Sequence, residues 1–360
     1  MQLSETVKLY LNEEQRSLLV RTMDEYIETV NDLVSSALNG AEIQNYSSKD
    51  VEADLPSALK NQCIRDARSL LRRYNRQRKT TDSPPVLKRP CCYINNQNYR
   101  IKGDRIEFPV SAAGKPRRLS VRTRMSEKQK EVFVSHKLGT LRIVFKNKRI
   151  VAQIVYEVKE TEPVKEGKEM GVDLGIKCPA VACTSDGLIR FYGNGRKNKY
   201  MRRRYASLRK KLQKEKHMDT VRRINSKEQR IMKDIDHKIS RKIVDTAVSK
   251  DVKVIKLEQL ANIRSSTRTS RKNNHSLHSW SFYRLSKFIE YKARKAGITV
   301  AYVDPAYTSQ RCPVCGSIHH AKDRTYTCKC GFAAHRDILG AMNICNATEY
   351  VGGSDIRHTA

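Results

Sequence analysis

Three acidic side chains stand where the sequence is otherwise apolar. Asp173 lies in the strand-like segment 171–176, Glu258 follows the apolar segment 252–257, and Asp337 begins an apolar helix-like segment. An unpaired charge within an apolar strand is costly, so Asp173 requires a compensating partner. Two aspartates and a glutamate supply the oxygen ligands with which two Mg²⁺ ions, about 3.5–4 Å apart, hydrolyse a phosphodiester. The three acids therefore predict metal-dependent hydrolysis of a phosphodiester. For each acid alone, a solvated strand end or a helix cap is the alternative.

Four cysteines give a second signal, in two pairs each followed by glycine: Cys312, Cys315, Cys328 and Cys330. Four thiolates satisfy a tetrahedral Zn²⁺ ion, and so short a segment depends on the metal to fold. We therefore predict one structural zinc ion. The second pair is one residue shorter than the usual C-x-x-C, so His319 or His320 in place of one cysteine is the alternative. The other six cysteines are scattered, which argues against a disulfide framework.

The chain is strongly basic. Its 360 residues include 71 Lys and Arg against 38 Asp and Glu, a formal net charge of +33. Such a charge attracts polyanions, so nucleic acid is the expected partner and an anionic membrane the alternative. No segment approaches 18 consecutive apolar residues, and the first ten residues lack the pattern of a signal peptide. We expect a soluble cytoplasmic protein without a membrane partner.

The positive charge is densest in segment 196–216, where eleven of twenty-one residues are Lys or Arg. On a helix this places positive charge on nearly every face, which favours contact with phosphates. An exposed basic helix that contacts nothing is the alternative. A polar loop after Glu258 is a second candidate for contact with a nucleic-acid backbone. The residues expected to bind nucleic acid are Arg202, Arg203, Arg204, Arg209 and Lys210 in the helix and Arg264, Arg268 and Arg271 in the loop.

The N-terminal half changes from helical to strand-like periodicity. Asn12 can cap a first helix, and a second is expected over about 56–78, before the breaker at Pro84 and Pro85. Short alternating segments follow as far as residue 160. They include 132–135, read as a strand, and a long hairpin formed by 141–145 and 150–158. The pattern predicts a barrel-like β domain interrupted by helices, with two separate small domains as the alternative.

The C-terminal half begins after a charged stretch, 160–168, that reads as a linker. The expected elements are strands at 171–176, 180–184 and 188–192, two long helices to about residue 250, a strand at 252–257, a helix at about 281–296 and a strand at 298–303. Asp186 and Gly187 give a strong hairpin signal, and Trp280 reads as a core anchor where a helix starts. This order is typical of an RNase H-like α/β domain: three antiparallel strands come first, and helices separate the strands that follow.

Two common enzyme classes lack their motifs. The sequence contains no G-x-x-x-x-G-K-[ST] loop of nucleotide hydrolases and no G-x-S-x-G turn of serine hydrolases.

In combination, these motifs resemble the TnpB family of RNA-guided nucleases, which bacterial and archaeal insertion sequences encode and which are related to type V CRISPR effectors. The resemblance covers most of residues 170–346. It rests on segments 171–176, 256–260, 291–293, 307–316 and 336–344, with the sequences GVDLGI, KLEQL, YKA, YTSQRCPVCG and RDILGAMNI.

The resemblance implies a role for each candidate residue. Asp173, Glu258 and Asp337 match the Mg²⁺ ligands of the family's RuvC site, with Asp173 bridging two ions, and the four cysteines match a zinc finger inserted before the last acid. The implied domains are a wedge β-barrel at 1–11 and 84–169, a helical recognition insert at 12–83, a RuvC nuclease domain at 170–311 and 331–360, and the zinc finger at 312–330.

The resemblance also implies partners. A guide RNA encoded near the element end would pair with double-stranded target DNA beside a short motif that the protein reads, and the RuvC site would cut both strands. No obligate protein partner is expected. The alternatives are an RNA-guided DNA-binding transcriptional repressor that does not cut, and a transposase that acts directly on element ends.

Overall fold

The chain divides into two compact units, Met1–Lys159 and Glu160–Ala360, and the boundary coincides with the start of the expected linker. The computed structural model describes residues 1–77, 84–112, 114–146, 149–260, 277–321 and 324–351, together with Ser270 and Asn274. Within these residues, every helix is too short or too polar to cross a membrane.

The first unit is built on a seven-stranded antiparallel sheet in the order β2-β6-β7-β1-β5-β4-β3. The strands are β1 (Gln2–Tyr10), β2 (Cys91–Ile94), β3 (Arg100–Lys102), β4 (Arg105–Ala112), β5 (Lys115–Arg124), β6 (Leu138–Lys146) and β7 (Arg149–Glu157). Strand β1 lies at the centre, between β7 and β5. The two edge strands, β2 and β3, do not pair with each other in the described residues. The sheet is therefore open, a half-barrel, where the sequence predicted a barrel-like domain.

Two helices pack against the strands of this sheet and share their hydrophobic core. Helix α1 (Glu13–Leu38) contacts both β2 and β4, and α2 (Ser57–Gln77) packs against α1 and β2. Asn12 caps α1 as predicted, in a capping box with Gln15. Helices and strands share one hydrophobic cluster, which includes Tyr26 of α1 and Phe108 of β4, both fully buried. The helical and β segments thus form one unit and not two separate domains; a short 3₁₀ turn, η1 (Ile43–Asn45), connects the helices.

One predicted strand of this unit is a helix. Segment 132–135 belongs to α3 (Glu127–Ser135), and Ser126 caps this helix in a second capping box with Gln129. Four residues are too few to separate a period of two from a helical period. The capping box, six residues earlier, specifies the helix.

The second unit is built on a five-stranded sheet in the order β10-β9-β8-β11-β12. The strands are β8 (Lys168–Asp173), β9 (Ala180–Thr184), β10 (Ile189–Tyr192), β11 (Val252–Glu258) and β12 (Thr299–Val303). The first three are antiparallel to one another, whereas β8, β11 and β12 run parallel. This confirms the predicted order of strands. The first strand, however, begins at Lys168 and ends at Asp173, so this acid stands at the end of a strand and not in its middle.

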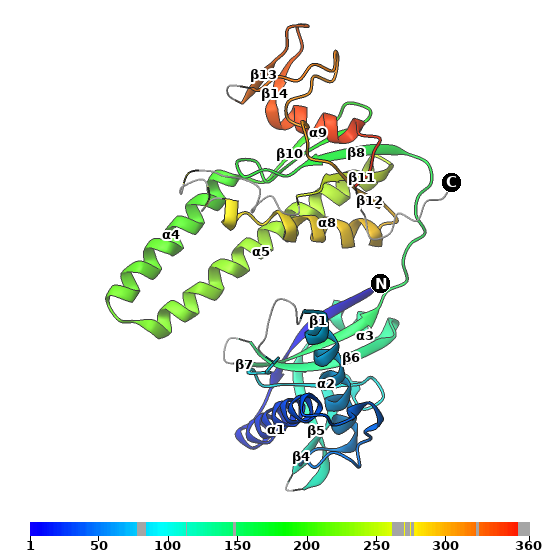
Figure 1. Ribbon diagram of the computed structural model, residues 1–360, viewed down its shortest axis with the longest axis vertical. Helices are drawn as coiled ribbons and strands as arrows, with labels where there is room; N and C mark the ends of the chain where they lie inside the picture. The colour runs from blue at the N-terminus through cyan, green and yellow to red at the C-terminus, as the bar shows by residue number, and fades with distance from the viewer. Residues whose placement is uncertain are drawn as a thin grey trace. The chain divides into compact units, whose positions relative to one another are not determined.

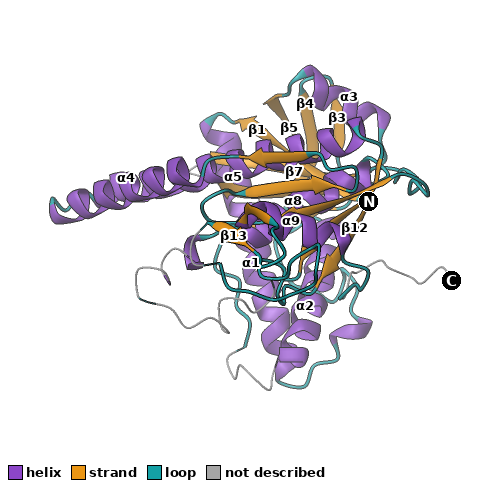
Figure 2. Cartoon of the chain, turned by 90° about the horizontal axis from the view of Figure 1, so that it is seen from above, coloured by secondary structure: helices purple, strands orange, loops and turns teal. Residues whose placement is uncertain are grey.

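Helices cover both faces of this sheet (Figure 1). Helices α5 (Met218–Ser249) and α8 (Phe282–Lys295) cover one face, and α9 (Arg336–Asn346) covers the other. The alternation along β9 shows the two faces: Ala180 and Ala182 contribute to the α5–α8 side, and Val181 packs with Ala341 of α9. Helix α4 (Gly195–Lys214) pairs with α5 in a hairpin that projects from the sheet (Figure 2).

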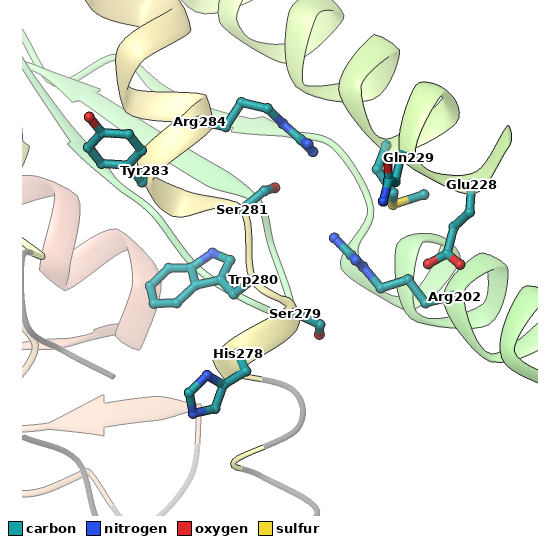
Figure 3. A pocket seen from close by; sticks show the side chains of 10 residues that line it. Arg202, Glu228, Gln229, His278, Ser279, Trp280, Ser281, Tyr283 and Arg284 are labelled. Carbon is teal, nitrogen blue, oxygen red and sulfur yellow. The ribbon is translucent and has the colours of Figure 1, made fainter. Parts of the chain in front are cut away.

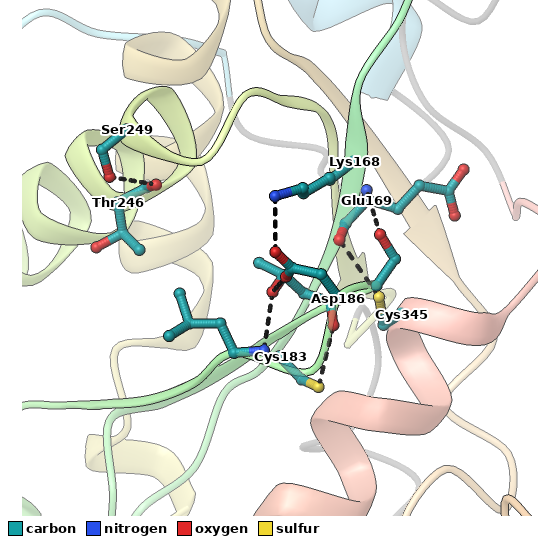
Figure 4. Close-up of polar contacts among 10 residues, drawn as sticks. Lys168, Glu169, Cys183, Asp186, Thr246, Ser249 and Cys345 are labelled. Carbon is teal, nitrogen blue, oxygen red and sulfur yellow. Dashed lines mark hydrogen bonds and ion pairs between the residues drawn. The ribbon is translucent and has the colours of Figure 1, made fainter.

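A buried lysine fixes the C-terminal end of α9. Nζ of Lys256 on β11 donates to the carbonyl oxygens of Cys345 and Ala347, at 2.7 and 2.6 Å, and forms an ion pair with Glu169 at 2.6 Å. Only 2 % of this side chain is exposed, so the carboxylate and the carbonyls together compensate its charge. The Sγ atom of Cys345 lies 3.5 Å from the carbonyl oxygen of Glu169 (Figure 4).

Gly171 permits α9 to approach β8 closely. A methyl group on this residue would lie 2.2 Å from the amide nitrogen of Cys345 and 2.3 Å from the carbonyl oxygen of Ala341. Because these are backbone atoms, we expect Gly171→Ala to lower the free energy of unfolding by about 1–3 kcal/mol. Thermal and denaturant unfolding measure the effect. Gly139→Ala is the control, since its methyl would meet the side chain of Val155 at 3.3 Å. Equal stability of the two variants would contradict this packing.

Candidate active site

The structure brings the three predicted acids to one edge of the five-stranded sheet. Asp173 ends β8 and Glu258 ends β11, and these parallel neighbours pair with Leu257 opposite Val172, one residue before each acid. The first turn of α9 carries Asp337. Gly340, three residues further along α9, faces the first acid: a methyl group there would lie 3.2 Å from Oδ2 of Asp173. The strand register and α9 therefore assemble three acids that are far apart in the sequence.

The electrostatics of this edge favour a cation. Burial raises the pKa of Asp173 well above its usual range, and the carboxylates of Glu258 and Asp337 raise it further. Burial also raises the pKa of Glu258, although the Thr308 hydroxyl donates a hydrogen bond to its carboxylate and acts in the opposite direction. The ionised forms of these acids are therefore destabilised in the metal-free protein, and a bound cation would stabilise them.

The third acid has a partner of its own. Nη1 of Arg324 donates to both carboxylate oxygens of Asp337, at 2.6 and 2.9 Å. Nδ1 of His335 accepts from the Asp337 amide at 3.2 Å, which caps α9 and fixes the backbone of the acid. The sequence did not predict Arg324 or Thr308 as members of this site. Only their long-range contacts show it, because neither residue stands at a spacing that signals a ligand.

The donor set fits a hard divalent cation. Asp173, Glu258 and Asp337 offer only carboxylate oxygens, which Mg²⁺ prefers. Their oxygens do not all lie within 4.8 Å of one another; in the described part of the chain, only the four cysteines form such a group. Asp337 is engaged by Arg324, and this arginine supplies the positive charge beside it.

The raised pKa values predict how the metal-free protein responds to pH. When pH rises above the usual carboxyl range, the unfolded chain releases protons that the folded Asp173 and Glu258 retain. The unfolded state then binds fewer protons, so stability falls as pH rises. In a chelator, the melting temperature of the wild type should decline more between pH 5 and 8 than that of Asp173→Asn. If the melting temperatures of the two proteins changed with pH in parallel, the raised pKa of Asp173 would be contradicted.

The four predicted cysteines converge. Their sulfur atoms lie within 4.8 Å of one another, at 3.6 Å for Cys312–Cys330 and 3.4 Å for Cys315–Cys328. A tetrahedral ion with Zn–S bonds of about 2.3 Å would hold sulfurs roughly 3.8 Å apart, so the four thiols fit zinc. Neither His319 nor His320 belongs to the group. The short second pair is accommodated by a turn that has Gly331 at φ +90°.

The cysteine segment packs onto the helix that carries the third acid. It contains the short hairpin of β13 (Thr325–Thr327) and β14 (Ala333–His335), which the sequence did not predict and which Figure 1 shows beside α9. Tyr326 of β13 is fully buried and clusters with Cys312 and with Leu339 of α9. Arg324, which precedes β13, forms the ion pair with Asp337. The segment therefore contributes directly to the position of that acid.

The predicted basic residues of α4 do not all face solvent. Arg203, Arg204 and Lys210 are exposed and available to phosphates. Arg209 forms an ion pair with Glu228 of α5, and Arg202 is half-buried between the two helices. The remaining three predicted residues, Arg264, Arg268 and Arg271, lie outside the described residues.

Two family models match the second unit and the end of the first. Residues 153–264 match OrfB_IS605, described as "Probable transposase", and residues 282–344 match the Cas12f1-like TNB domain. The first match contains Asp173 and Glu258, and the second contains Asp337 and the four cysteines.

Curated proteins match the same region. The TnpB-like protein MJ0751 of Methanocaldococcus jannaschii is 32% identical over 43% of this chain and 59% of its own length. The CRISPR-associated endodeoxyribonuclease Cas12f1 of Sulfoacidibacillus thermotolerans is 29% identical over 51% of this chain and 47% of its own length. The chain thus spans about half the length of these relatives.

A solved structure shares the fold over most of the chain. The Cas12f1 chain of a Cas12f1–sgRNA–target DNA complex matches with a TM-score of 0.68 at 15% identity, over 92% of this chain and 82% of that one. The mini-RNA-guided endonuclease Cas_phi3 matches with a TM-score of 0.54 at 12% identity, over 96% and 92%. Matching domains, relatives and fold agree. The chain is therefore similar to TnpB-like proteins in sequence and to type V CRISPR effectors in fold.

Proposed function

We propose that this protein is an RNA-guided DNA endonuclease whose second unit is an RNase H-like RuvC domain with an inserted zinc finger. The observation that carries the proposal is the convergence of Asp173, Glu258 and Asp337 at one edge of the sheet, where burial and mutual repulsion destabilise the ionised acids. Relatives named as endodeoxyribonucleases support DNA as the substrate.

Each side chain has a proposed task in phosphodiester hydrolysis. Asp173, Glu258 and Asp337 would hold the Mg²⁺ ions through their carboxylate oxygens. When bound, the ions supply activation of the attacking water and stabilisation of the leaving oxygen. Thr308 orients the carboxylate of Glu258 through its hydrogen bond. Arg324 holds Asp337 in place and adds positive charge where the phosphate must approach.

The four cysteines hold one structural zinc ion in this proposal. Four thiolates leave no position open for water or substrate, so the ion orders the segment and takes no part in the reaction. The ion would affect cleavage only indirectly, because Arg324 forms an ion pair with Asp337 and Tyr326 packs against α9.

A guide RNA and double-stranded DNA are the proposed partners. The solved Cas12f1 relative is a complex with guide RNA and target DNA, and the net charge of +33 suits two polyanions. Base pairing with the guide would select the target, and the protein would read a short flanking motif before the site cuts both strands.

The proposal is tested by sequencing RNA that co-purifies with the protein, followed by cleavage of a plasmid library that randomises the flanking motif. Cleavage with Mg²⁺ that requires both the bound RNA and one flanking motif is expected. Binding of the matched plasmid without cleavage would support the repressor instead. Cleavage that is independent of RNA would support the transposase.

A further inference from the structure

A pocket of about 340 Å³ in the second unit lies between the α4–α5 hairpin and the start of α8 (Figure 3). Arg202, Glu228 and Gln229 line it from the hairpin, and Trp280, Ser281 and Arg284 line it from α8 and the residues before it. Its volume falls in the range of small-molecule sites, and it combines an aromatic ring with a few polar groups, as such sites do.

Arg202 supplies charge that no acid of the pocket pairs with directly, although Glu228 and Asp236 lie close enough to attract it. Glu228 is paired with Arg209, and Asp236, behind the pocket, is paired with Arg284 at 2.6 Å. Arg202 makes no hydrogen bond or ion pair within the described residues, although its guanidinium is half-buried and always charged. Figure 3 shows this side chain directed from α4 into the pocket. The first turn of α8, which also lines the pocket, adds a helix N-terminus that favours an anion.

A second, smaller pocket adjoins this place. It has a volume of about 70 Å³, and it shares Arg202, Trp280 and two serines with the larger one. Its lining also includes Gly175 and Ile176, which follow Asp173 closely in the sequence. The residues around Arg202 and Trp280 therefore adjoin the loop that follows the first acid.

We propose that the larger pocket binds one unpaired nucleotide of the strand presented to the three acids, with its phosphate on Arg202 and its base against Trp280. This inference rests on the proposed function, because a nucleic-acid strand held at the acids is what would bring a nucleotide to this pocket. An arginine recognises phosphate through charge-assisted hydrogen bonds, and an aromatic ring stacks with any base. The site would hold the strand on one side of the cut without reading its sequence.

Trp280 is the only tryptophan of the chain, so fluorescence excited at wavelengths that tyrosine does not absorb reports on this pocket. The full-length protein, in chelator to prevent cleavage, is titrated with AMP, dAMP, adenosine and inorganic phosphate. The two nucleotides should change the fluorescence in a saturable way at lower concentrations than adenosine or phosphate. A stronger response to AMP would assign the nucleotide to RNA, and an equal or stronger response to dAMP would assign it to DNA.

Arg202→Gln and Arg203→Gln form a matched pair, because the two residues are adjacent on α4 and carry the same charge, but only Arg202 lines the pocket. The Arg202 variant should weaken nucleotide binding at least about tenfold, and the Arg203 variant less than about twofold. Arg202→Lys should restore part of the affinity, and melting temperatures confirm that each variant is folded.

Several results would overturn the inference. Equal losses in the two glutamine variants would show non-specific attraction to a basic surface. A response to phosphate as strong as that to AMP would remove the role of the base. If the protein cut DNA with its guide RNA but responded to no nucleotide, the pocket would be refuted and the proposed function would stand. If it bound nucleotides in a saturable way but did not cut DNA with a guide RNA, the pocket would stand and the proposed function would be refuted.

Discussion

Asp173→Asn is expected to abolish DNA cleavage, with a fall in rate of at least about a thousandfold, and to leave RNA binding and the fold intact. The amide has nearly the shape of the carboxylate, but it lacks the negative charge that would hold a divalent cation, and several kcal/mol of transition-state stabilisation would be lost. The variant should also be as stable as the wild type or more so, because it removes a carboxylate whose pKa is raised by burial and by Glu258 and Asp337.

Asp186→Asn is the matched control for this experiment. Asp186 belongs to the same sheet, but it pairs with Lys168 at 2.7 Å, at the opposite end of β8 (Figure 4). Both partners are partly exposed, so the control should lose little stability and no activity. Cleavage rates with matched guide RNA and melting temperatures measure both variants. Normal cleavage by Asp173→Asn would refute the proposed site, and equal loss in the control would show that the assay reports folding.

Removing the metal from the cysteine segment should have the second-largest effect. In Cys328→Ser we expect the bound zinc to fall from one ion per chain to nearly none and cleavage to fall at least about a hundredfold. The segment has a very small core, Cys312, Tyr326 and Leu339, and depends on the ion to fold. Once it unfolds, Arg324 no longer holds Asp337, and the N-terminal half of α9 loses its cover.

Elemental analysis, limited proteolysis and cleavage assays measure this effect together. Cuts by protease should appear within residues 312–335 and not in the five-stranded sheet, whose strands keep their own core. Cys91→Ser is the control, since this cysteine lies in β2 of the first unit and should retain zinc and activity. Full activity of a zinc-free Cys328→Ser protein would contradict the proposed link between the segment and the third acid.

The sequence predicted the second unit better than the first. Residues 180–184 were predicted as the strand that the structure shows as β9, and their nearly continuous apolar run explains this accuracy, because both faces of the strand are covered. The barrel-like shape was predicted only in part, because closure depends on whether the edge strands β2 and β3 meet, and no short-range pattern in the sequence specifies that contact. Segment 132–135 was wrong because its local alternation was weaker evidence than the capping box at Ser126.

The candidate active site was also predicted only in part from the sequence. Sequence reasoning identified Asp173, Glu258 and Asp337 one by one, and the structure places them at one edge. It could not identify Arg324, because only the fold of the cysteine segment brings that guanidinium to Asp337. Lys256 was missed for a similar reason: a lysine in a strand reads as exposed, and here the end of α9 and Glu169 bury it.

The position of α9 in the sequence has a consequence for biosynthesis. Asp337 follows Asp173 by 164 residues (337 − 173), so a ribosome releases β8 and β11 well before the helix that covers them. Until then, Val181 and Cys183 have no partner on their face of the sheet, and the nascent chain exposes an apolar surface that invites aggregation or a chaperone. It also lacks its third acid during that interval. The candidate active site would therefore be complete only after α9 has been synthesised.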